Sequence, residues 1–420
     1  MPFPRRALPR MAKIRQLLPS GHISDAREEV REKLLATGLA RSVRPGAKIA
    51  ITAGSRGIGG FVALARGIVD AVKSCGGEPF IIPAMGSHGG ATPSGQEEVL
   101  RRLGITSDSV DAPVRATMDT VALGAAENGA VAHLDRLAYD ADGIIVLGRV
   151  KTHPDSAGEL ASGLLKMSTI GLGKQAGAQQ AHNHGLWDSV RQVPEIQLSR
   201  ARILCGVAVV ENGYREPLAV EVAPPDYRAF LDADMRLLNL AKAHLAVIPF
   251  DSLDLLVVDE LGKTVSGAGM DPNIIGRWRH TDGPHLPDYR RIAVLSLTEA
   301  SLGNGLGIGM ADTTTQRFAA AFDPRVTYVN LLTAIGPGGN TREGLLPLAL
   351  PSDREAAEVA LYSALAGAAP RVCRIKNTRE LDEMWVSEGL IDEVKSNPKL
   401  TIISELGDPP YDSAGNLLHG

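Results

Sequence analysis

Short β-rich runs alternate along this chain with amphipathic segments, and glycine-rich polar clusters stand where the runs end. Four such runs lie in the first half of the sequence, at 48–52, 78–83, 143–147 and 207–211. Residues 61–75, after the first run, carry apolar side chains at helical spacing. This alternation is typical of parallel α/β architecture, in which ligands bind at the carboxyl ends of the strands. We therefore expect an α/β protein with mainly parallel sheets and a ligand site in those loops, although glycine and proline also mark ordinary turns.

The second half repeats the pattern after one long helical segment at 226–245, which we interpret as a connector. Further strands are expected at 253–259, 292–297 and 326–330, and the tail reads as a strand at 372–376, a helix at 380–395 and a strand at 399–404. The sequence thus predicts two α/β domains, 1–246 and 247–420, with the tail packing back on the first domain.

Charge and cysteine content exclude several classes of protein. A net charge of −4 and a pI near 6.2 argue against a nucleic-acid partner. No apolar run reaches the length of about 18 residues that a membrane span needs, and no apolar stretch follows the basic N-terminus as in a secretory signal. The three cysteines form no C-x-x-C pair. We expect a cytoplasmic protein with no membrane partner.

Two polar loops follow the first two predicted strands. Arg56 lies in GSRGIGG, where backbone N–H groups and a guanidinium suit a phosphate or carboxylate, although a surface ion pair would also explain the arginine. The glycine order does not match the dinucleotide fingerprint G-x-G-x-x-G. His88 lies in MGSHGG, whose glycines allow a ligand to approach closely.

Lysines and histidines are densest between residues 148 and 185. Lys166 has apolar neighbours in LLKM, which favour a neutral, nucleophilic amine, although its stem could also pack while the ammonium stays in water. His153, His182 and His184 could serve as metal ligands or acid–base groups. Because His182 and His184 are two residues apart, we expect at most one of them to bind a metal. The absence of H-E-x-x-H and C-x-x-C motifs argues against an ordinary zinc hydrolase site.

In the second half, the polar segment 259–277 begins where a strand is expected to end and contains Glu260 and Lys263. Such a loop is often functional when a rigid sheet positions it. The similar segment 303–317 contains Asp312, but Asp and Thr at a helix start are well explained as caps.

Taken together, these residues resemble the nickel-pincer-nucleotide-dependent lactate racemase family. The resemblance rests on their order and spacing and on three patterns, KTHPD, SGLLKMSTIGLGK and ELGKTVSGAGMDPN, which are closest to a divergent branch of that family. It covers most of residues 45–315, and the interval from Lys166 to His182 matches especially well.

The resemblance implies a role for each residue. His88 and His153 would be the acid–base pair, assisted by Lys263, while Arg56 and Glu260 would bind the substrate. The cofactor would be the nickel pincer nucleotide, pyridinium-3-thioamide-5-thiocarboxylic acid mononucleotide with nickel. Its expected contacts are a covalent bond to Lys166, the nickel ligand His182, and the cofactor-binding residues Lys174, Gly54 and Ser55. The active site would lie in the cleft between the two domains, and Trp278 is the candidate for the aromatic residue that covers it.

The resemblance thus implies a racemase or epimerase of a 2-hydroxy acid that moves the C2 hydrogen as hydride to and from the cofactor. Imidazole titrates near neutral pH and therefore suits the proton transfers. The expected partners are a small hydroxy acid, cofactor-maturation proteins and a second copy of the chain in a homo-oligomer. The alternative is a nucleotide- or nickel-binding protein of the same fold without racemase activity, which would need no acid–base pair.

Overall fold

The computed structural model describes residues 3–154, 156, 158–278, 286–335 and 340–418, and the chain divides into two compact units. The first unit comprises residues 19–153 and 158–245, and the second comprises residues 1–18, 154–157 and 246–420. The division after residue 245 lies beside the boundary expected at 246. The first 18 residues, expected in the first domain, instead belong to the second unit because their strand pairs within its sheet.

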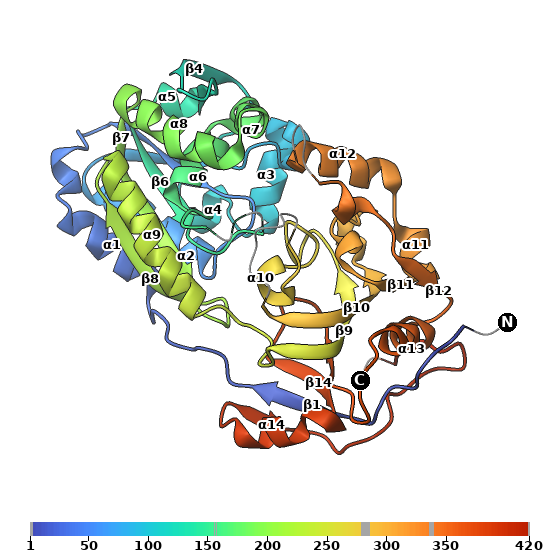
Figure 1. Cartoon of the computed structure of the whole chain (residues 1–420). Coiled ribbons are helices and arrows are strands. Elements are labelled where there is room, and N and C mark those ends of the chain that lie inside the picture. Colours follow the sequence, from blue (N-terminus) through green and yellow to red (C-terminus); the bar gives the residue numbers. More distant parts are fainter. Residues whose placement is uncertain (1–2, 155, 157, 279–285, 336–339, 419–420) are drawn as a thin grey trace. The chain divides into compact units, whose positions relative to one another are not determined.

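The first unit is built on a five-stranded sheet in the order β3-β2-β6-β7-β8, of which β6, β7 and β8 are labelled in Figure 1. The strands span Glu78–Pro83, Lys48–Ala53, Gly143–Arg149, Ile203–Glu211 and Pro217–Ala223 in that order. The first four are parallel to one another, and only β8 runs antiparallel, to β7. A separate antiparallel pair consists of β4 (Thr120–Ala125) and β5 (Val131–Asp135).

Helices cover both faces of this sheet. Along β2, Ile49 and Ile51 belong to the core on the side of α1 and α2, while Ala50 belongs to the core on the side of α6, α8 and α9. The period of two in a strand produces this alternation, so a strand that is buried on both faces is apolar throughout. The helices of the unit are α1 Ala26–Ala36, α2 Phe61–Ser74, α3 Pro93–Arg102, α4 Ser107–Val110, α5 Arg136–Tyr139, α6 Leu164–Lys166, a π-helix Met167–Leu172, α7 Lys174–Asn183, α8 Leu186–Arg200 and α9 Tyr227–Ala243.

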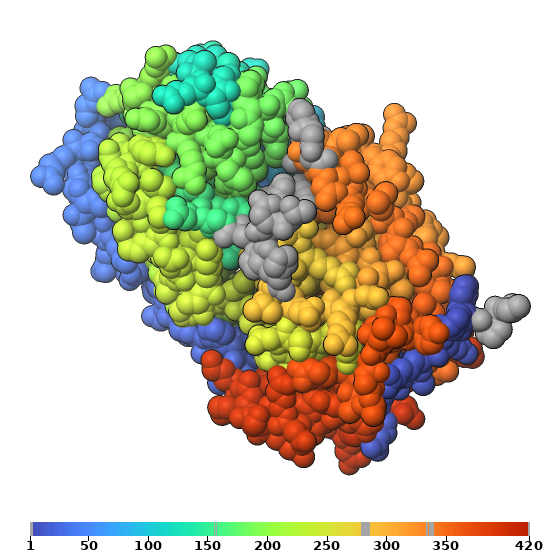
Figure 2. All heavy atoms as spheres, in the orientation of Figure 1, coloured from blue at the N-terminus to red at the C-terminus, as the bar shows by residue number. Residues whose placement is uncertain are grey.

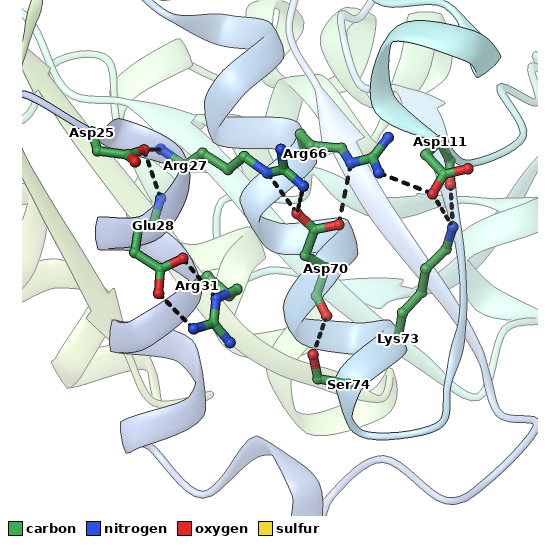
Figure 3. Close-up of polar contacts among 9 residues, drawn as sticks. All are labelled: Asp25, Arg27, Glu28, Arg31, Arg66, Asp70, Lys73, Ser74 and Asp111. Carbon is green, nitrogen blue, oxygen red and sulfur yellow. Dashed lines mark hydrogen bonds and ion pairs between the residues drawn. The ribbon is translucent and has the colours of Figure 1, made fainter.

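An ion-pair network joins the helices on the α1–α2 side (Figure 3). The carboxylate of Asp70 on α2 lies 2.6 Å from Arg27 of α1 and 3.1 Å from Arg66. Asp111, directly after α4, in turn pairs with Arg66 at 3.1 Å and with Lys73 at 2.8 Å. The hydrogen bond from Lys73 lowers the pKa of Asp111. The network therefore ties α1, α2 and the end of α4 into one layer.

The second unit contains an eight-stranded sheet in the order β12-β11-β10-β9-β13-β14-β1-β15. Pairing is parallel from β12 to β13 and antiparallel from β13 to β15. The strands are β1 Met11–Gln16, β9 Ser252–Leu261, β10 Asp288–Leu297, β11 Thr313–Thr315, β12 Leu348–Leu350, β13 Val372–Ile375, β14 Glu383–Ser387 and β15 Leu400–Ile402. The helices are α10 Pro272–Ile275, α11 Gln316–Ala321, α12 Pro324–Ile335, α13 Asp353–Ser363 and α14 Ile391–Ser396.

Strand β1 lies inside this sheet rather than at its edge. It pairs with β14 on one side, with Met11 opposite Ser387, and with β15 on the other, with Gln16 opposite Leu400. The residues before it also lie on the second unit, where the blue N-terminal segment runs along the orange and red surface (Figure 2). There Arg6 donates hydrogen bonds to the carbonyl oxygens of Ala366 and Gly367 at 2.5 and 2.7 Å. The tail therefore pairs with β1, within the second unit.

Two expectations for this half were wrong. Residues 326–330, expected as a strand, lie in α12, because Asp323 accepts hydrogen bonds from the N–H groups of Arg325 and Val326 and Pro324 begins the helix. The helix expected at 380–395 is strand β14 followed by the short α14, because β14 fills the position between β13 and β1.

The predicted fold class, α/β with mainly parallel sheets, is confirmed by both sheets. The helices that the structure describes include none that is both long enough and apolar enough to cross a membrane.

The position of β1 yields a stability prediction. Ile14 is fully buried in β1, so Ile14→Ala should lower the free energy of unfolding by about 2–5 kcal/mol in urea denaturation. Arg15→Ala is the matched control, because that side chain is 63% exposed and its ion pair with Glu383 should contribute about 1 kcal/mol or less. If Ile14→Ala lowered the free energy of unfolding no more than Arg15→Ala does, burial of Ile14 in β1 would not stabilise the second unit.

Candidate active site

Three of the predicted site residues follow adjacent parallel strands of the first unit. His88 follows β3, Arg56 follows β2 and His153 follows β6, and these strands are neighbours in the order β3-β2-β6. Neighbouring strands are about 4.8 Å apart, so the three loops leave the same edge of the sheet side by side. The Arg56 loop is the middle one, between the loops that carry the two histidines. The side chains of Arg56 and His88 are exposed, and that of His153 is half-buried.

His153, Lys166 and Trp187 form a contact cluster. The Nζ atom of Lys166 lies 2.5 Å from Nε2 of His153 and 6.0 Å from the centre of the Trp187 ring. The ring of His153 meets that of Trp187 edge to face, with centroids 5.2 Å apart. If Lys166 donates, Nε2 is the acceptor and the imidazole proton resides on Nδ1. All three residues are partly exposed to solvent.

The sequence analysis did not identify Trp187 as part of this cluster. The sequence feature that could have indicated Trp187 is weak. Trp187 is the first aromatic residue after the stretch of small residues that carries the lysines and histidines. Asp155, the acidic residue of the KTHPD pattern, lies outside the described residues.

Lys166 is presented by a short helix whose start is capped by a buried carboxylate. Asp234 of α9 accepts hydrogen bonds from the N–H groups of Leu164 and Leu165 at 2.7 and 3.0 Å. Helix α6 ends at Lys166, and a π-helix continues from Met167, a conformation frequent at functional sites. Burial raises the pKa of Asp234 to about 7, against the two backbone hydrogen bonds, which act to lower it.

Glu211, at the end of β7, holds the loop that carries Arg56. Its carboxylate accepts from the Gly59 N–H at 2.6 Å and from the guanidinium of Arg149 at 2.5 Å. Gly59 has no room for a side chain, because a Cβ atom there would lie 1.9 Å from the carbonyl oxygen of Arg215. At the start of the loop, Gly54 and Ser55 are half-buried, and a Cβ on Gly54 would lie 3.1 Å from Cε of Met167. The loop is therefore packed beside the residue that follows Lys166.

Lys174, predicted to bind the cofactor, is instead enclosed by protein. Its side chain is fully buried, and Nζ donates to the Pro83 carbonyl at 2.8 Å and to Oε1 of Gln96 at 2.6 Å. It also lies 3.4 Å from the buried carboxylate of Asp135. Burial lowers the pKa of Lys174 and raises that of Asp135. Because these partners occupy its ammonium group, we remove Lys174 from the proposed cofactor contacts.

His182, the predicted nickel ligand, lies half-buried in the last turn of α7. His184 follows at the C-cap, where its Nδ1 lies 3.0 Å from the carbonyl oxygen of Gln180. Among the residues that the structure describes, no group of three or more His, Cys, Asp or Glu side chains could hold a metal ion. A metal at His182 would therefore need ligands besides the described His, Cys, Asp and Glu side chains.

Glu260 and Lys263 belong to the second unit, at the end of β9 and just beyond it. Glu260 accepts a hydrogen bond from the Asn377 amide at 2.8 Å. The Nζ atom of Lys263 donates to the Gly267 carbonyl at 2.5 Å, and its backbone N–H donates to Ser301 Oγ at 3.0 Å. Trp278 lies in the same unit. The predicted cleft between the domains, and the roles of these residues in it, stay predictions.

Comparisons with known proteins give a family match and a similarity to a solved structure. A family model described as "Domain of unknown function (DUF362)" matches residues 59–270, half of the chain. The lactate racemase apoprotein from Thermoanaerobacterium thermosaccharolyticum is similar in structure, with 12% sequence identity and a TM-score of 0.45 over 84% of this chain and 86% of that one. No curated protein matches the sequence. The family match spans His88, His153, Lys166, His182 and Lys263, and Arg56 stands just before it.

The Asp234 cap predicts a pH-dependent stability. The folded protein holds the Asp234 proton up to about pH 7, whereas an unfolded chain releases it near the ordinary value of 3.8. Between those values the folded state binds more protons, so this group's contribution to stability is lost as pH rises. Asparagine does not titrate, so the free energy of unfolding of the Asp234→Asn variant should fall less as pH rises. Urea unfolding of both proteins from about pH 4 to about pH 8 measures the difference. Parallel curves would contradict the assignment.

Proposed function

This chain belongs to the DUF362 family, a domain of unknown function, and from its site residues we propose that it is a racemase or epimerase of a 2-hydroxy acid that uses a nickel pincer nucleotide. The observation that carries the proposal is the 2.5 Å contact between Lys166 Nζ and His153 Nε2 beside Trp187. It brings the amine expected to attach the cofactor next to a histidine expected to move the substrate proton.

The Lys166–His153 pair suits both roles. An imidazole that accepts a hydrogen bond from an amine can also take its proton, which leaves the amine nucleophilic for attachment. A lysine nitrogen joined through a thioamide retains one N–H, so the contact with His153 can persist afterwards. Trp187 limits the space around both side chains and excludes water from one side of them.

The order of the loops suits inversion at one carbon atom. Arg56 can hold the substrate carboxylate through two charge-assisted hydrogen bonds, and its loop is the middle one of three. His88 and His153 belong to the loops on either side, so one imidazole would serve each face of a substrate held at Arg56. One histidine would take the hydroxyl proton, and the other would return a proton when the hydroxyl is restored on the opposite face.

The donor set fits the proposed cofactor. A nickel ion held by side chains alone would need several ligands, and the described residues provide no such group. If bound, a pincer nucleotide would bring ligands of its own to the nickel, so His182 would need to supply only one imidazole, and imidazole suits nickel. When bound, the cofactor would supply the acceptor for the C2 hydrogen as hydride.

The first test is cofactor loading. Protein co-expressed with cofactor-maturation proteins should carry about one nickel per chain and a covalent adduct, by metal analysis and intact mass. Lys166→Ala should lose the adduct because it removes the attaching amine, while Lys151→Ala is the control on a nearby lysine. Chiral chromatography with a panel of 2-hydroxy acids then measures racemisation.

The outcomes of the loading test separate the two functions. Racemisation that depends on both the adduct and Lys166 supports the enzyme. An adduct without racemisation of any 2-hydroxy acid would favour the alternative, a nucleotide- or nickel-binding protein. Bare polypeptide mass and no nickel after co-expression would contradict the enzyme and the nickel-binding form of the alternative.

The second test concerns Arg56. Arg56→Lys keeps the charge but loses the bidentate fork, so binding of the hydroxy acid should weaken by roughly ten- to a hundredfold, or about 1.5–3 kcal/mol. Arg44→Lys, at an exposed arginine outside the loop, is the matched control. The KM of the loaded protein measures the effect, and unchanged kinetics would remove Arg56 from the site.

A further inference from the structure

The loop that carries His88 is held from inside the protein by one buried glutamine. Gln96, in the first turn of α3, is fully buried, and its Nε2 donates to the carbonyl oxygens of Gly86 and His88 at 2.8 and 3.2 Å. The backbone of the same turn packs on the loop, because a Cβ on Gly95 would lie 1.8 Å from the Gly89 carbonyl oxygen. The peptide that bears the His88 side chain is therefore fixed on its inner side.

The orientation of Gln96 is in turn set by Lys174. The amide oxygen of Gln96 accepts from Lys174 Nζ at 2.6 Å, so the amide nitrogen is directed toward the two loop carbonyls. Lys174 also donates to the carbonyl of Pro83, the last residue of β3, and Asp135 balances its charge at 3.4 Å. One ammonium group thus contacts the end of the strand and the side chain that holds the loop after it.

Lys174 is also the first residue of the helix that bears His182. The π-helix that precedes it, which begins directly after Lys166, touches the same loop. A Cβ on Gly171 would lie 2.8 Å from the Ala84 carbonyl oxygen, and one on Gly86 would lie 3.1 Å from Cγ2 of Ile170. The hydrogen bonds of Lys174 and Gln96 therefore connect the loop of His88 to the segment that carries both Lys166 and His182.

We propose that Lys174 and Gln96 are positioning residues that hold the backbone of His88 in register with the segment that bears Lys166 and His182. The role given to His88 rests on the proposed function, but the hydrogen-bonded connection through Lys174 and Gln96 does not. A charged group in a core is costly, and apolar residues of similar volume often stabilise a fold as well or better. The hydrogen bond from Lys174 to Gln96 orients the side chain that holds the loop of His88, which an apolar residue of the same volume could not do.

Gln96→Glu tests the connection selectively. Glutamate keeps an oxygen for Lys174 and gains an ion pair with it, but it replaces the donor nitrogen with an oxygen that repels the two loop carbonyls. The loop should be released while the fold is retained. Gln179→Glu, an exposed position on α7, is the matched control for the added charge.

Amide hydrogen exchange followed by mass spectrometry, on protein without substrate, is the first measurement. Exchange in residues 84–92 should rise by roughly tenfold or more in Gln96→Glu, with the strands β2, β6 and β7 unchanged. If Gln96→Glu does not fold, the paired variant Lys174→Met with Asp135→Asn removes both charges and should give the same local rise. Unchanged exchange at 84–92 in the folded variant would overturn the proposal, whether or not the protein is a racemase.

The second measurement is kinetic and uses the loaded enzyme. Misplacement of His88 should lower kcat by roughly ten- to a hundredfold while KM stays near its wild-type value, because Arg56 is held separately. A general loss of structure would instead reduce the active fraction and raise exchange everywhere. Faster exchange at 84–92 with unchanged kcat would overturn the positioning role. If the wild type shows no racemase activity, the proposed function fails while the exchange result still decides the connection.

Discussion

Parallel pairing of β3, β2 and β6 is the constraint on which the candidate site depends. The backbone hydrogen bonds of these strands fix their order and direction, and therefore fix which loops are neighbours at the carboxyl edge. Residues separated by 97 positions in sequence, Arg56 and His153, are neighbours in this sense because their strands pair directly. Substitution of the side chains on each loop would not alter the order of the loops, as is general for folds whose functional residues lie on loops.

Each site segment is also held by a buried or half-buried polar side chain from another part of the first unit. Glu211 holds the loop of Arg56, Asp234 caps the helix of Lys166, and Gln96 with Lys174 holds the loop of His88. Loops rich in glycine lose much conformational entropy when they are ordered. Hydrogen bonds from buried polar side chains to the loop backbone offset part of that loss. Polar side chains of the first unit thus fix the positions of the segments that carry the site residues.

Local patterns predicted the first unit better than the second. The strand at 78–83 matches β3 because its apolar run and flanking glycines are local signals. The strand expected at 326–330 failed because Val, Thr and Tyr favour strands, while the cap from Asp323 and the proline that starts α12 outweighed that propensity. Among the site residues, Lys166 and His153 are in contact, and both lie in the stretch 148–185 where the sequence analysis found lysines and histidines to be densest. Lys174 could not be interpreted from sequence, because its partners come from residues 83, 96 and 135.

The interior position of β1 has a consequence for how the chain matures during synthesis. Residues 11–16 leave the ribosome long before their partners in β14 and β15, which belong to residues 383–402. All of the first unit has been synthesised once residue 245 has emerged, so it can fold while β1 is still unpaired. Until those strands arrive, the apolar side chains of Met11 and Ile14, which are buried in the folded protein, have no native partner. During that interval it is the kind of exposed strand that chaperones bind and that nascent chains misassemble through.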